Sequence, residues 1–511
     1  MKKTIIVILM FIVTLGLVSC NGSSDFDKLK EEFPKQDIYY QIFVRSFADS
    51  DDDGVGDLNG ITNKLDYLSN LGITAVWLTP IHPTITYHGY EIADYYDINP
   101  EFGTMEDLQN LIDKADQKGI KIIMDMVFNH TWEGHEWYVD AFNNLDSPYR
   151  DYYIFPNNAK PGTSAYETFP FSRDLNLRSE ALQNELTNIL KFYLDKGISG
   201  FRFDAVKHYF EKPYDPNYSN NPTFEGGMIL RNLKQSVIDE YPNAYFIGEY
   251  FEYNVSDYRD FYLGADSMLD FEISRIFQNQ AYSTMNSVLN RIYENLDSYN
   301  PNYIDAPFIT NHDLDRFASM NENLANQKFA ASVLLTLPGN PYIYYGEELG
   351  MKGKRLENQT VEGYVDSEGN LIGVYDEPRR QPFLWDQDDS ALTTWFPLRD
   401  GNENLARYSQ QLEDENSLLN HYQKFIQIRR DNPALMFGNS YIRVLNLPGT
   451  ISFIRTIEVD NITQTVLVVH NFTNNSKIIN ASVVRNIYGT QEIPALGTYI
   501  AEINSTTLEI K

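Results

Sequence analysis

Hydrophobic positions along the chain fall into short runs that alternate with longer segments of helical period. The short runs are rich in β-branched and aromatic residues, which is typical of strands buried on both faces of a parallel sheet. Eight runs predict strands, at Ile38–Val44, Ala75–Pro80, Lys121–Val127, Gly200–Ala205, Tyr245–Tyr250, Met268–Ile273, Ile304–Thr310 and Pro341–Gly346. Helices are expected between them, for example at Met105–Lys118 and Ser179–Lys196, each followed by a glycine that would end it.

Two segments depart from this repeat of strand and helix. Residues 131–177 follow the third strand, are rich in aromatic residues, Asn, Asp and Pro, and are too long for an ordinary loop. We expect a small inserted domain there. Residues 437–511 change to alternating patterns that predict an antiparallel β-sandwich, as in Tyr441–Leu445, Thr450–Thr456 and Thr465–Asn471. The expected α/β fold is therefore a (β/α)₈ TIM barrel, residues 36–130 and 178–436, with an inserted and a C-terminal domain.

The amino terminus has the pattern of a targeting signal. Lysines precede an apolar stretch, Ile5–Val18, that is too short for an ordinary membrane-spanning helix. The sequence Leu17–Cys20 resembles a bacterial lipobox, whose cysteine is lipidated after the signal peptide, here residues 1–19, is removed. We therefore expect an exported bacterial lipoprotein, periplasmic or on the cell surface, that is anchored to a membrane through Cys20. Residues 20–35 are polar and charged and are expected to form a flexible tether.

The negative charge of the chain excludes some classes of binding partner. With 71 acidic and 41 basic side chains the net charge is −30, which would repel phosphate backbones and anionic lipids. Nucleic acid is therefore excluded as a partner, and membrane contact is expected only through the lipid anchor. A neutral sugar polymer meets no such repulsion, and the 36 Tyr and 30 Phe residues suit stacking on sugar rings. We expect the chain to act as a monomer.

Charged side chains end four of the predicted strands, where a purely structural strand would avoid them. These strand ends are Asp125–His130, Gly200–His208, Gly248–Glu249 and Phe308–Asp313. Because the carboxyl ends of barrel strands converge on one mouth, we expect their side chains to meet there.

The acids at these strand ends suit the hydrolysis of an acetal. That reaction needs one carboxyl group to protonate the leaving oxygen and another to attack or support the cationic anomeric carbon. A third anion stabilises the positive transition state. Asp204, Glu249 and Asp313 could supply this set. Arg202 lies two residues before Asp204, on the same strand face, and could keep that carboxyl group ionised.

The four strand ends resemble the signature regions of the α-amylase superfamily, glycoside hydrolase family 13, in order and in spacing. The resemblance runs from about Ile38 to the end of the chain, and family-like stretches also occur at Tyr87–Tyr90, Asp94–Tyr96 and Gly339–Gly346. It implies that Asp204 is the nucleophile, Glu249 the general acid/base and Asp313 the transition-state stabiliser. The reaction would retain the anomeric configuration, with the carboxyl groups of the first two acids roughly 5 Å apart.

The same resemblance implies contacts to the glucose whose bond is cut. His130 and His312 would bind its hydroxyls, and Tyr90 would stack under its ring with His88 close by. Arg202 would orient the nucleophile. Lys207 and His208 would border the leaving-group side.

An acidic loop, residues 49–57, follows the first predicted strand. Its carboxylates at positions one, three, five and nine, with glycine at six and a backbone carbonyl at seven, reproduce the spacing of an EF-hand. The glutamate expected at position twelve is replaced by Gly60, so the loop is not a true EF-hand. A similar loop binds calcium in oligo-1,6-glucosidase-like members of the family. The implied calcium ligands are Asp49, Asp51, Asp53, Val55 and Asp57.

The bond that is cleaved is less sharply indicated. Lys207–His208 is typical of α-amylases, whereas the acidic loop and Asp376–Pro382 resemble the oligo-1,6-glucosidase branch. We expect retaining cleavage of α-1,4-glucosidic bonds in starch, glycogen-type glucans and maltooligosaccharides. The alternatives are an oligo-1,6-glucosidase or α-glucosidase, a maltogenic-type hydrolase and a transglycosylase. A more distant one is an inactive glucan-binding surface lipoprotein, which would typically lack one of the three acids.

Overall fold

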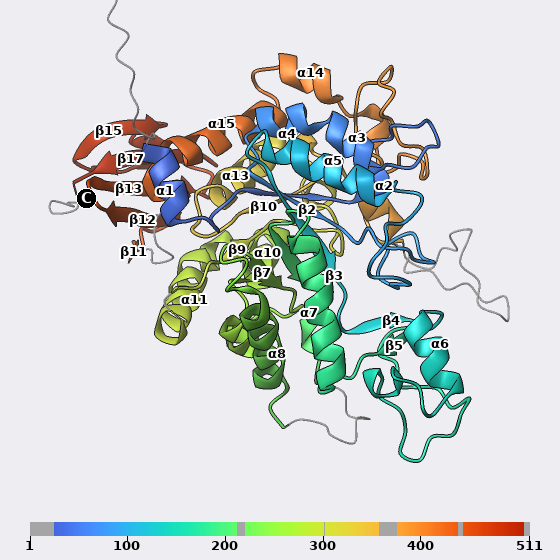
Figure 1. Cartoon of the computed structure of the whole chain (residues 1–511). Coiled ribbons are helices and arrows are strands. Elements are labelled where there is room, and N and C mark those ends of the chain that lie inside the picture. Colours follow the sequence, from blue (N-terminus) through green and yellow to red (C-terminus); the bar gives the residue numbers. More distant parts are fainter. Residues whose placement is uncertain (1–24, 212–219, 301, 357–375, 438–442, 505–511) are drawn as a thin grey trace, which may run out of the picture.

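Eight parallel strands form the centre of the molecule (Figure 1). The computed structural model describes residues 25–211, 220–300, 302–356, 376–437 and 443–504, so the expected signal peptide and Cys20 lie outside the described residues. The strands pair in the order β10-β1-β2-β3-β6-β7-β8-β9, and a parallel bridge from Phe308 to Tyr342 closes the barrel. They are β1 (Tyr39–Ile42), β2 (Ala75–Leu78), β3 (Lys121–Met126), β6 (Gly200–Phe203), β7 (Tyr245–Gly248), β8 (Ser267–Asp270), β9 (Ala306–Pro307) and β10 (Tyr342–Tyr344). The predicted (β/α)₈ barrel is confirmed.

The end of the sixth predicted strand is a helix in the structure. The sequence predicts a strand as far as Ile273, but β8 ends at Asp270 and the helix α10 begins at Phe271. The Asp270 carboxylate accepts a hydrogen bond from the backbone N–H of Ile273 at 2.9 Å. This side-chain cap starts a helix inside an apolar run that would otherwise favour a strand.

Helices cover the outside of the barrel. They are α2 (Val44–Phe47), α3 (Leu58–Asn63), α4 (Leu65–Leu71), α5 (Met105–Asp116), α7 (Glu180–Leu194), α8 (Pro222–Val237), α9 (Val255–Tyr258), α10 (Phe271–Gln278), α11 (Met285–Tyr299), α12 (Phe317–Met320), α13 (Leu324–Leu334), α14 (Tyr408–Glu413), α15 (Leu418–Asp431) and α16 (Pro433–Met436). In α5, Thr104 and Asp107 form a capping box, and Leu108, Leu111 and Ala115 are buried on one face. Among the helices in the described part of the chain, none has both the length and the apolar character needed to cross a membrane.

Aromatic side chains fill the interior of the barrel. Tyr39 stacks on Tyr342 and on Tyr245, with ring centroids 4.5 and 5.4 Å apart, and Trp77 meets Tyr342 edge-on. Because this layer is packed, charged side chains at the carboxyl ends of the strands must project into the mouth rather than into the barrel.

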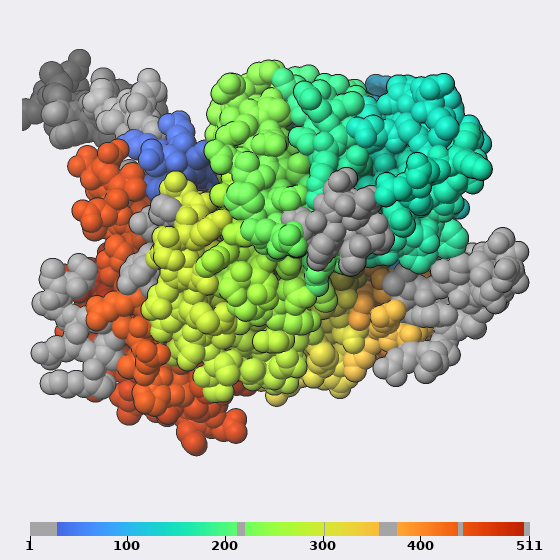
Figure 2. Space-filling model, turned by 90° about the horizontal axis from the view of Figure 1, so that it is seen from below, coloured from blue at the N-terminus to red at the C-terminus, as the bar shows by residue number. Residues whose placement is uncertain are grey.

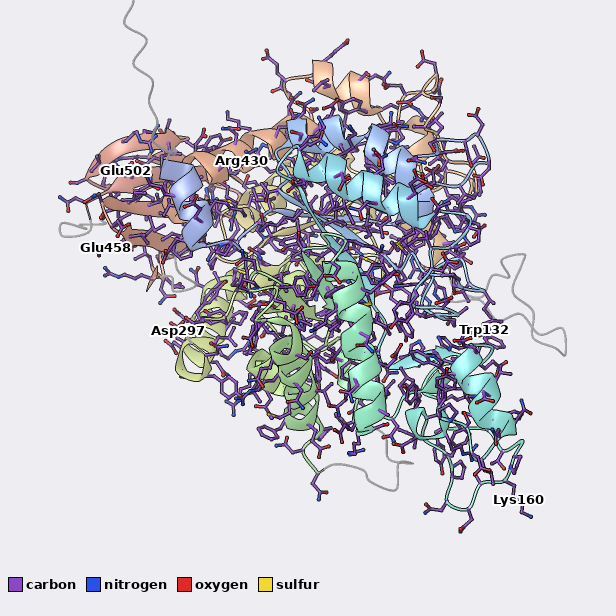
Figure 3. All side chains as sticks on the ribbon, viewed as in Figure 1. Trp132, Lys160, Asp297, Arg430, Glu458 and Glu502 are labelled. Carbon is purple, nitrogen blue, oxygen red and sulfur yellow. The ribbon has the colours of Figure 1, made fainter. Side chains whose placement is uncertain are left out.

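A small domain is inserted after β3. It consists of the antiparallel pair β4 (His130–Trp132) and β5 (Ser172–Asp174), the helix α6 (Glu136–Asn143) and a short 3₁₀ turn at Arg150–Tyr152. The C-terminal domain lies on the opposite side of the barrel, as Figure 2 shows from below. In Figure 3, Trp132 and Lys160 mark the inserted domain, and Glu458 and Glu502 mark the C-terminal one.

The C-terminal domain is built from two layers of antiparallel strands, as predicted. Its main sheet has the order β11-β12-β13-β17-β15, and a two-stranded ribbon pairs β14 with β16. These strands are β11 (Arg443–Val444), β12 (Thr450–Val459), β13 (Ile462–Asn471), β14 (Lys477–Ile478), β15 (Val483–Tyr488), β16 (Glu492–Ile493) and β17 (Thr498–Ile503). Phe453 and Val468 face the barrel core, whereas Leu467 and Val469 pack with Ile493 of the ribbon.

Two buried arginines lie near the junction of the barrel and the C-terminal domain, and one of them, Arg455, connects the two. Arg429 of α15 donates hydrogen bonds to the carbonyl oxygens of Leu335 and Leu337, at 2.9 and 2.7 Å. Arg455 of β12 donates to the carbonyl oxygens of Leu337 and Leu435, each at 3.0 Å. Both side chains are almost completely buried. They satisfy carbonyl groups just after α13 and in the last turn of α16 that would otherwise be buried without partners.

Residues 25–35 do not form the flexible tether that the sequence predicts. They begin with the helix α1 (Asp25–Glu32), which lies beside the C-terminal sheet in Figure 1. Leu29 is only 1% exposed, and Phe33 stacks on Phe437 with ring centroids 6.2 Å apart. These two apolar side chains, isolated among charged residues in the sequence, attach the segment to the folded body.

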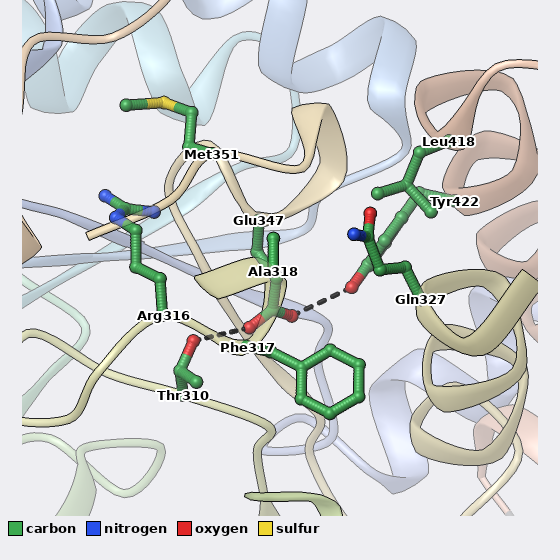
Figure 4. A pocket seen from close by; sticks show the side chains of 9 residues that line it. All are labelled: Thr310, Arg316, Phe317, Ala318, Gln327, Glu347, Met351, Leu418 and Tyr422. Atoms are coloured by element: carbon green, nitrogen blue, oxygen red, sulfur yellow. Dashed lines mark hydrogen bonds between the residues drawn. The ribbon is translucent and has the colours of Figure 1, made fainter. Parts of the chain in front are cut away.

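A small enclosed pocket lies beside the turn that follows β10. Its lining residues are Thr310, Arg316, Phe317, Ala318, Gln327, Glu347, Met351, Leu418 and Tyr422. In it the Glu347 carboxylate accepts hydrogen bonds from the hydroxyls of Thr310 and Tyr422, at 2.8 and 2.9 Å (Figure 4). No salt bridge to Glu347 is found in the described part of the chain. Burial raises the pKa of Glu347 from 4.5 to about 7.

This pKa makes stability depend on pH. The folded state keeps the Glu347 proton up to about pH 7, whereas the unfolded chain releases it near its ordinary pKa of 4.5. Stability therefore falls as pH rises between these two values, by about 3 kcal/mol in total from this group, and then levels off. Thermal unfolding at pH 5 and pH 7.5 should show this fall, and Glu347→Gln should reduce it. Glu403→Gln, an exposed control, should not. An undiminished fall in Glu347→Gln would contradict the interpretation.

Candidate active site

One guanidinium group joins the ends of three neighbouring strands. Arg202 of β6 donates hydrogen bonds from Nη1 to Oδ1 of Asp125 and to Oδ1 of Asp204, each at 2.7 Å. Its Nη2 lies 3.7 Å from Oε2 of Glu249, which follows β7. The guanidinium also lies over the ring of Tyr90, 5.8 Å from its centroid. The predicted nucleophile and general acid/base are thus held around the same cation.

The backbone beside Asp204 has an unusual conformation. Ala205 has φ 47° and ψ 38°, in the left-handed region that residues with a Cβ atom rarely adopt. Its N–H donates a hydrogen bond to Oε2 of Glu249 at 2.9 Å. Strained residues of this kind concentrate at functional sites, and here the strained turn connects two of the predicted catalytic residues.

Burial and mutual repulsion shape the acidity of these carboxyl groups. Burial raises the pKa of Asp125, of Asp204 and of Glu249, and the Arg202 cation acts in the opposite direction on each. Three buried carboxylates exceed the charge of one guanidinium, so the group tends to retain a proton.

The third predicted acid, Asp313, faces the same space from the other side of the mouth. Its negative charge contributes to the raised pKa of both Asp204 and Glu249. The side chain is 37% exposed, with Oδ1 3.3 Å from Nη2 of Arg380 and Oδ2 3.3 Å from Nε2 of His312. The structure therefore brings all three acids together at one accessible mouth.

A hydrogen-bonded chain connects the two sides of the mouth. Nε2 of Gln41 donates to Nδ1 of His312 at 2.7 Å, so the proton of this neutral imidazole lies on Nε2. That nitrogen is 2.6 Å from the hydroxyl of Tyr90, which donates to Oδ2 of Asp125 at 3.1 Å. Burial, together with the charges of Arg380 and other cations, lowers the pKa of His312 well below its usual value.

The remaining predicted contact residues lie around this chain. His88 is half-buried, and its Nδ1 accepts from the backbone N–H of Tyr90 at 3.3 Å. Burial lowers the pKa of His88. His130 uses Nε2 to donate to the carbonyl oxygen of Tyr90 at 3.1 Å. Both histidines thus support the backbone of Tyr90, which was predicted to stack under the sugar.

The Lys-His pair lies farther out, beside the inserted domain. Lys207 forms an ion pair with Glu252 at 2.5 Å. The ring of Phe169, from the inserted domain, meets His208 edge-on, with ring centroids 5.4 Å apart. It also contacts His130, at 5.2 Å and with the rings tilted by 58°. Phe169 therefore connects the predicted sugar-binding histidine to the predicted leaving-group side.

Several residues of the site were not identified from the sequence as site residues. They are Gln41, Trp77, Asp125, Phe169, Asp376 and Arg380. Asp125 had a detectable signal, since it opens one of the charged strand ends. Asp376 and Arg380 lie in a stretch whose resemblance to oligo-1,6-glucosidases indicates a branch of the family but no position at the mouth. Phe169 lies in the aromatic-rich insertion, where nothing in the pattern distinguishes it from its neighbours.

The acidic loop after β1 brings three of its four predicted carboxylates together. Oxygens of Asp49, Asp51 and Asp57 lie within 4.8 Å of one another. The Asp53 carboxylate instead accepts from the N–H of Val55 at 2.7 Å and is not part of this group. Oδ2 of Asp49 accepts from the N–H of Gly54 at 2.7 Å, so backbone amides offset part of the negative charge. Oδ1 of Asp49 and Oδ1 of Asp57 each accept two hydrogen bonds, whereas Oδ2 of both residues accepts one. Each carboxylate thus keeps an oxygen that could bind an ion, and such a set fits a hard divalent cation.

Comparisons with known proteins agree with this geometry. A family model described as the catalytic domain of α-amylase matches residues 41–438. The chain is 36% identical to α-amylase 3 of Dictyoglomus thermophilum, over 98% of this chain and 97% of that protein. It is 29% identical to an oligo-1,6-glucosidase of Bacillus cereus, over 87% and 92%. The crystal structure of an α-amylase from H. orenii superposes with a TM-score of 0.78 and 32% identity, over 92% and 100%. The chain therefore belongs to the α-amylase family, glycoside hydrolase family 13.

Proposed function

We propose that this glycoside hydrolase cleaves α-1,4-glucosidic bonds in starch, glycogen-type glucans and maltooligosaccharides with retention of configuration. The observation that carries the proposal is the shared Arg202 guanidinium, which holds Asp204 and Glu249 side by side. A retaining mechanism needs this closeness, because one acid attacks the carbon whose leaving oxygen the other protonates.

The two acids differ in their contacts with Arg202, and this difference gives them different roles. Asp204 accepts a direct hydrogen bond at 2.7 Å, which favours its ionised form and suits a nucleophile. Glu249 lies farther away, at 3.7 Å, and is the better place for the retained proton. Glu249 would donate that proton to the leaving glycosidic oxygen while Asp204 forms a bond to the anomeric carbon. Water would then attack the anomeric carbon and give a proton to Glu249, while the bond to Asp204 breaks and releases its carboxylate.

The opposite wall of the mouth would support the sugar during this reaction. Asp313 carries a negative charge toward the same space and would stabilise the oxocarbenium-like transition state. The neutral imidazole of His312 donates its Nε2 proton to the hydroxyl of Tyr90, and this contact would hold the Tyr90 ring in place beneath the sugar. Its ring is parallel to that of Tyr90, at 8°, which presents a flat apolar surface for a pyranose.

The preference for α-1,4 bonds rests on two further points. Lys207–His208 is the α-amylase-like pair, and the contact of His208 with Phe169 extends the mouth beyond the glucose that is cut. The identity to the relative named α-amylase, 36%, also exceeds the 29% to the oligo-1,6-glucosidase. Both names occur among the relatives, so oligo-1,6-glucosidase is the second candidate.

Product analysis separates these two candidates. With maltoheptaose and isomaltotriose as substrates, we expect kcat/KM to be at least about 10²-fold higher for maltoheptaose, which is about 2.7 kcal/mol in transition-state binding. Asp204→Asn should lose about 10⁴-fold on either substrate, which controls for contaminating enzymes. Preferential cleavage of isomaltotriose would favour the second candidate. Products longer than the substrate would indicate a transglycosylase, and starch binding without cleavage an inactive binding protein.

Arg380 is proposed to position Asp313. Its Nη2 bridges Oδ1 of Asp313, at 3.3 Å, and Oδ2 of Asp376, at 2.6 Å, and its Nε donates to the carbonyl oxygen of His312 at 3.2 Å. The side chain is buried and lies over the ring of Tyr87. These contacts fix both the backbone and the carboxylate of the residue that would stabilise the transition state.

Removing this contact should slow catalysis more than it weakens binding. Arg380→Met should lower kcat by about 10²-fold with a smaller change in KM, since a displaced Asp313 misses the developing charge. Arg380→Lys, which keeps the positive charge, should recover part of the loss. The exposed residue Arg399 supplies the control, Arg399→Met, which should behave like the wild type. Unchanged kcat in Arg380→Met would contradict the proposed role.

A calcium ion is proposed at the loop formed by residues 49–57. Asp49, Asp51 and Asp57 would supply carboxylate ligands, and the ion would tie together the connection between β1 and α3. Asp57 also caps α3 by accepting from the N–H of Gly60 at 2.7 Å, so the loop directly continues into that helix.

Thermal unfolding with and without calcium tests this site. A ligand that binds only the folded state stabilises by about 2.7 kcal/mol when its free concentration is about 100 times Kd. We therefore expect Ca²⁺ to raise the Tm of chelator-treated protein, and Asp51→Ala to remove this increase. Asp52→Asn is a matched control, because Asp52 lies in the same loop outside the group of three and Asn tolerates its φ of 68°. An equal increase in Asp51→Ala would refute the site.

We also propose that the protein is exported and lipidated at Cys20. The supporting features are the apolar stretch Ile5–Val18, the lipobox-like Leu17–Cys20 and the absence of any other cysteine from the sequence.

A further inference from the structure

The segment that follows α1 closes the amino-terminal end of the barrel. Lys35 forms an ion pair with Asp266, at 3.0 Å, directly before β8. The carbonyl oxygen of Lys35 accepts from the side-chain amide of Asn340, at 2.9 Å, shortly before β10. Lys121, the first residue of β3, donates to the carbonyl oxygen of Pro34. The segment thus contacts the starts of three barrel strands.

A buried carboxylate fixes this closure. The Asp37 side chain is fully buried and forms ion pairs with Lys30, at 2.5 Å, and with Lys121, at 2.9 Å. Its backbone N–H donates to the side chain of Asn340 at 2.9 Å. Losing a partner would leave a buried charge poorly compensated, which is strongly destabilising. Residues 30–37 are therefore held firmly at this end.

This end is the pole opposite the active site. The barrel strands are parallel, so all of them start at the closed end and finish at the mouth that holds Asp204, Glu249 and Asp313. Figure 1 shows α1 beside the C-terminal sheet, with the inserted domain on the far side of the barrel. Figure 2 shows the same arrangement from below. The described chain therefore begins on the side away from the catalytic mouth.

The distance from the expected anchor to this pole is short. Four residues lie between Cys20 and Asp25, so the two are five residue steps apart. A fully extended chain spans at most about 3.6 Å per step, which gives about 18 Å. The folded body then begins directly with α1. A lipid on Cys20 would therefore prevent the barrel from rotating freely relative to the membrane, which a long tether would allow.

We propose that the anchored enzyme stands on the bilayer with the closed end of its barrel toward the lipid and its catalytic mouth toward the solution. This orientation rests on the proposed lipidation of Cys20. The net charge of −30 acts in the same sense, because an anionic membrane would repel the body and disfavour a flat arrangement. A glucan polymer would then reach the mouth without crossing the headgroup region.

Fluorescence quenching in lipid vesicles tests the orientation. Lipidation consumes the thiol of Cys20, the only cysteine, so a single introduced cysteine can carry one label. Gln117→Cys places the label at the exposed end of α5, close to the start of β3, and Lys160→Cys places it on the inserted domain (Figure 3). With a nitroxide quencher on the lipid headgroups, we expect several-fold stronger quenching at position 117 than at position 160. Equal or reversed quenching would overturn the proposal.

Two further variants test the closure and the lipid anchor separately. The double variant Lys30→Ala, Lys35→Ala removes two ion pairs of the closure and should reduce the difference between the labels while the protein still floats with vesicles. An unchanged difference would show that the closure does not set the orientation. Cys20→Ala should not float at all. If the wild type does not float either, the anchor and the orientation both fail. Reducing-sugar release from starch is measured separately, so a failure of the proposed activity would remain distinguishable.

Discussion

The arrangement of the mouth depends on the charge balance around Arg202. This guanidinium is almost completely buried, and its contacts reach the ends of β3, β6 and β7. Without it, buried carboxylates would repel one another and would each carry a large desolvation cost. With it, the same carboxylates are held close but remain short of positive charge, which favours retention of a proton. The cation that organises the site is also the one whose unequal contacts with Asp204 and Glu249 underlie their proposed roles.

Much of this site follows from sequence because barrel topology fixes where strand ends go. Asp204, Glu249 and Asp313 could be assigned to one mouth once the strands were recognised, since their places depend on the backbone alone. Arg380 and Phe169 could not, because they come from irregular segments whose paths are set by tertiary packing. The sequence does not predict the helix α1 for a related reason. The segment is mostly charged, and only the packing of Leu29 and Phe33 on the folded body attaches it.

The inserted domain is part of the site rather than an addition to it. β3 continues almost directly into β4, whose first residue, His130, pairs with Asp174 of β5. The same histidine supports the backbone of Tyr90 and contacts Phe169. Folding of the insertion and shaping of the proposed sugar-binding surface are thus coupled through one residue. Changes in the insertion can then alter which glucans are accepted while leaving the acids in place.

The buried Arg455 has a consequence for how this protein could be divided or recombined. The match to the catalytic family model ends at residue 438, yet Arg455, which lies beyond that point, satisfies carbonyl groups of Leu337 and Leu435 before it. A fragment cut at the family boundary would lose those donors and would expose the apolar face on which Phe453 packs. The segment matched by the family model is therefore smaller than the unit that folds. If C-terminal domains were exchanged between relatives, the new domain would have to supply a matching arginine.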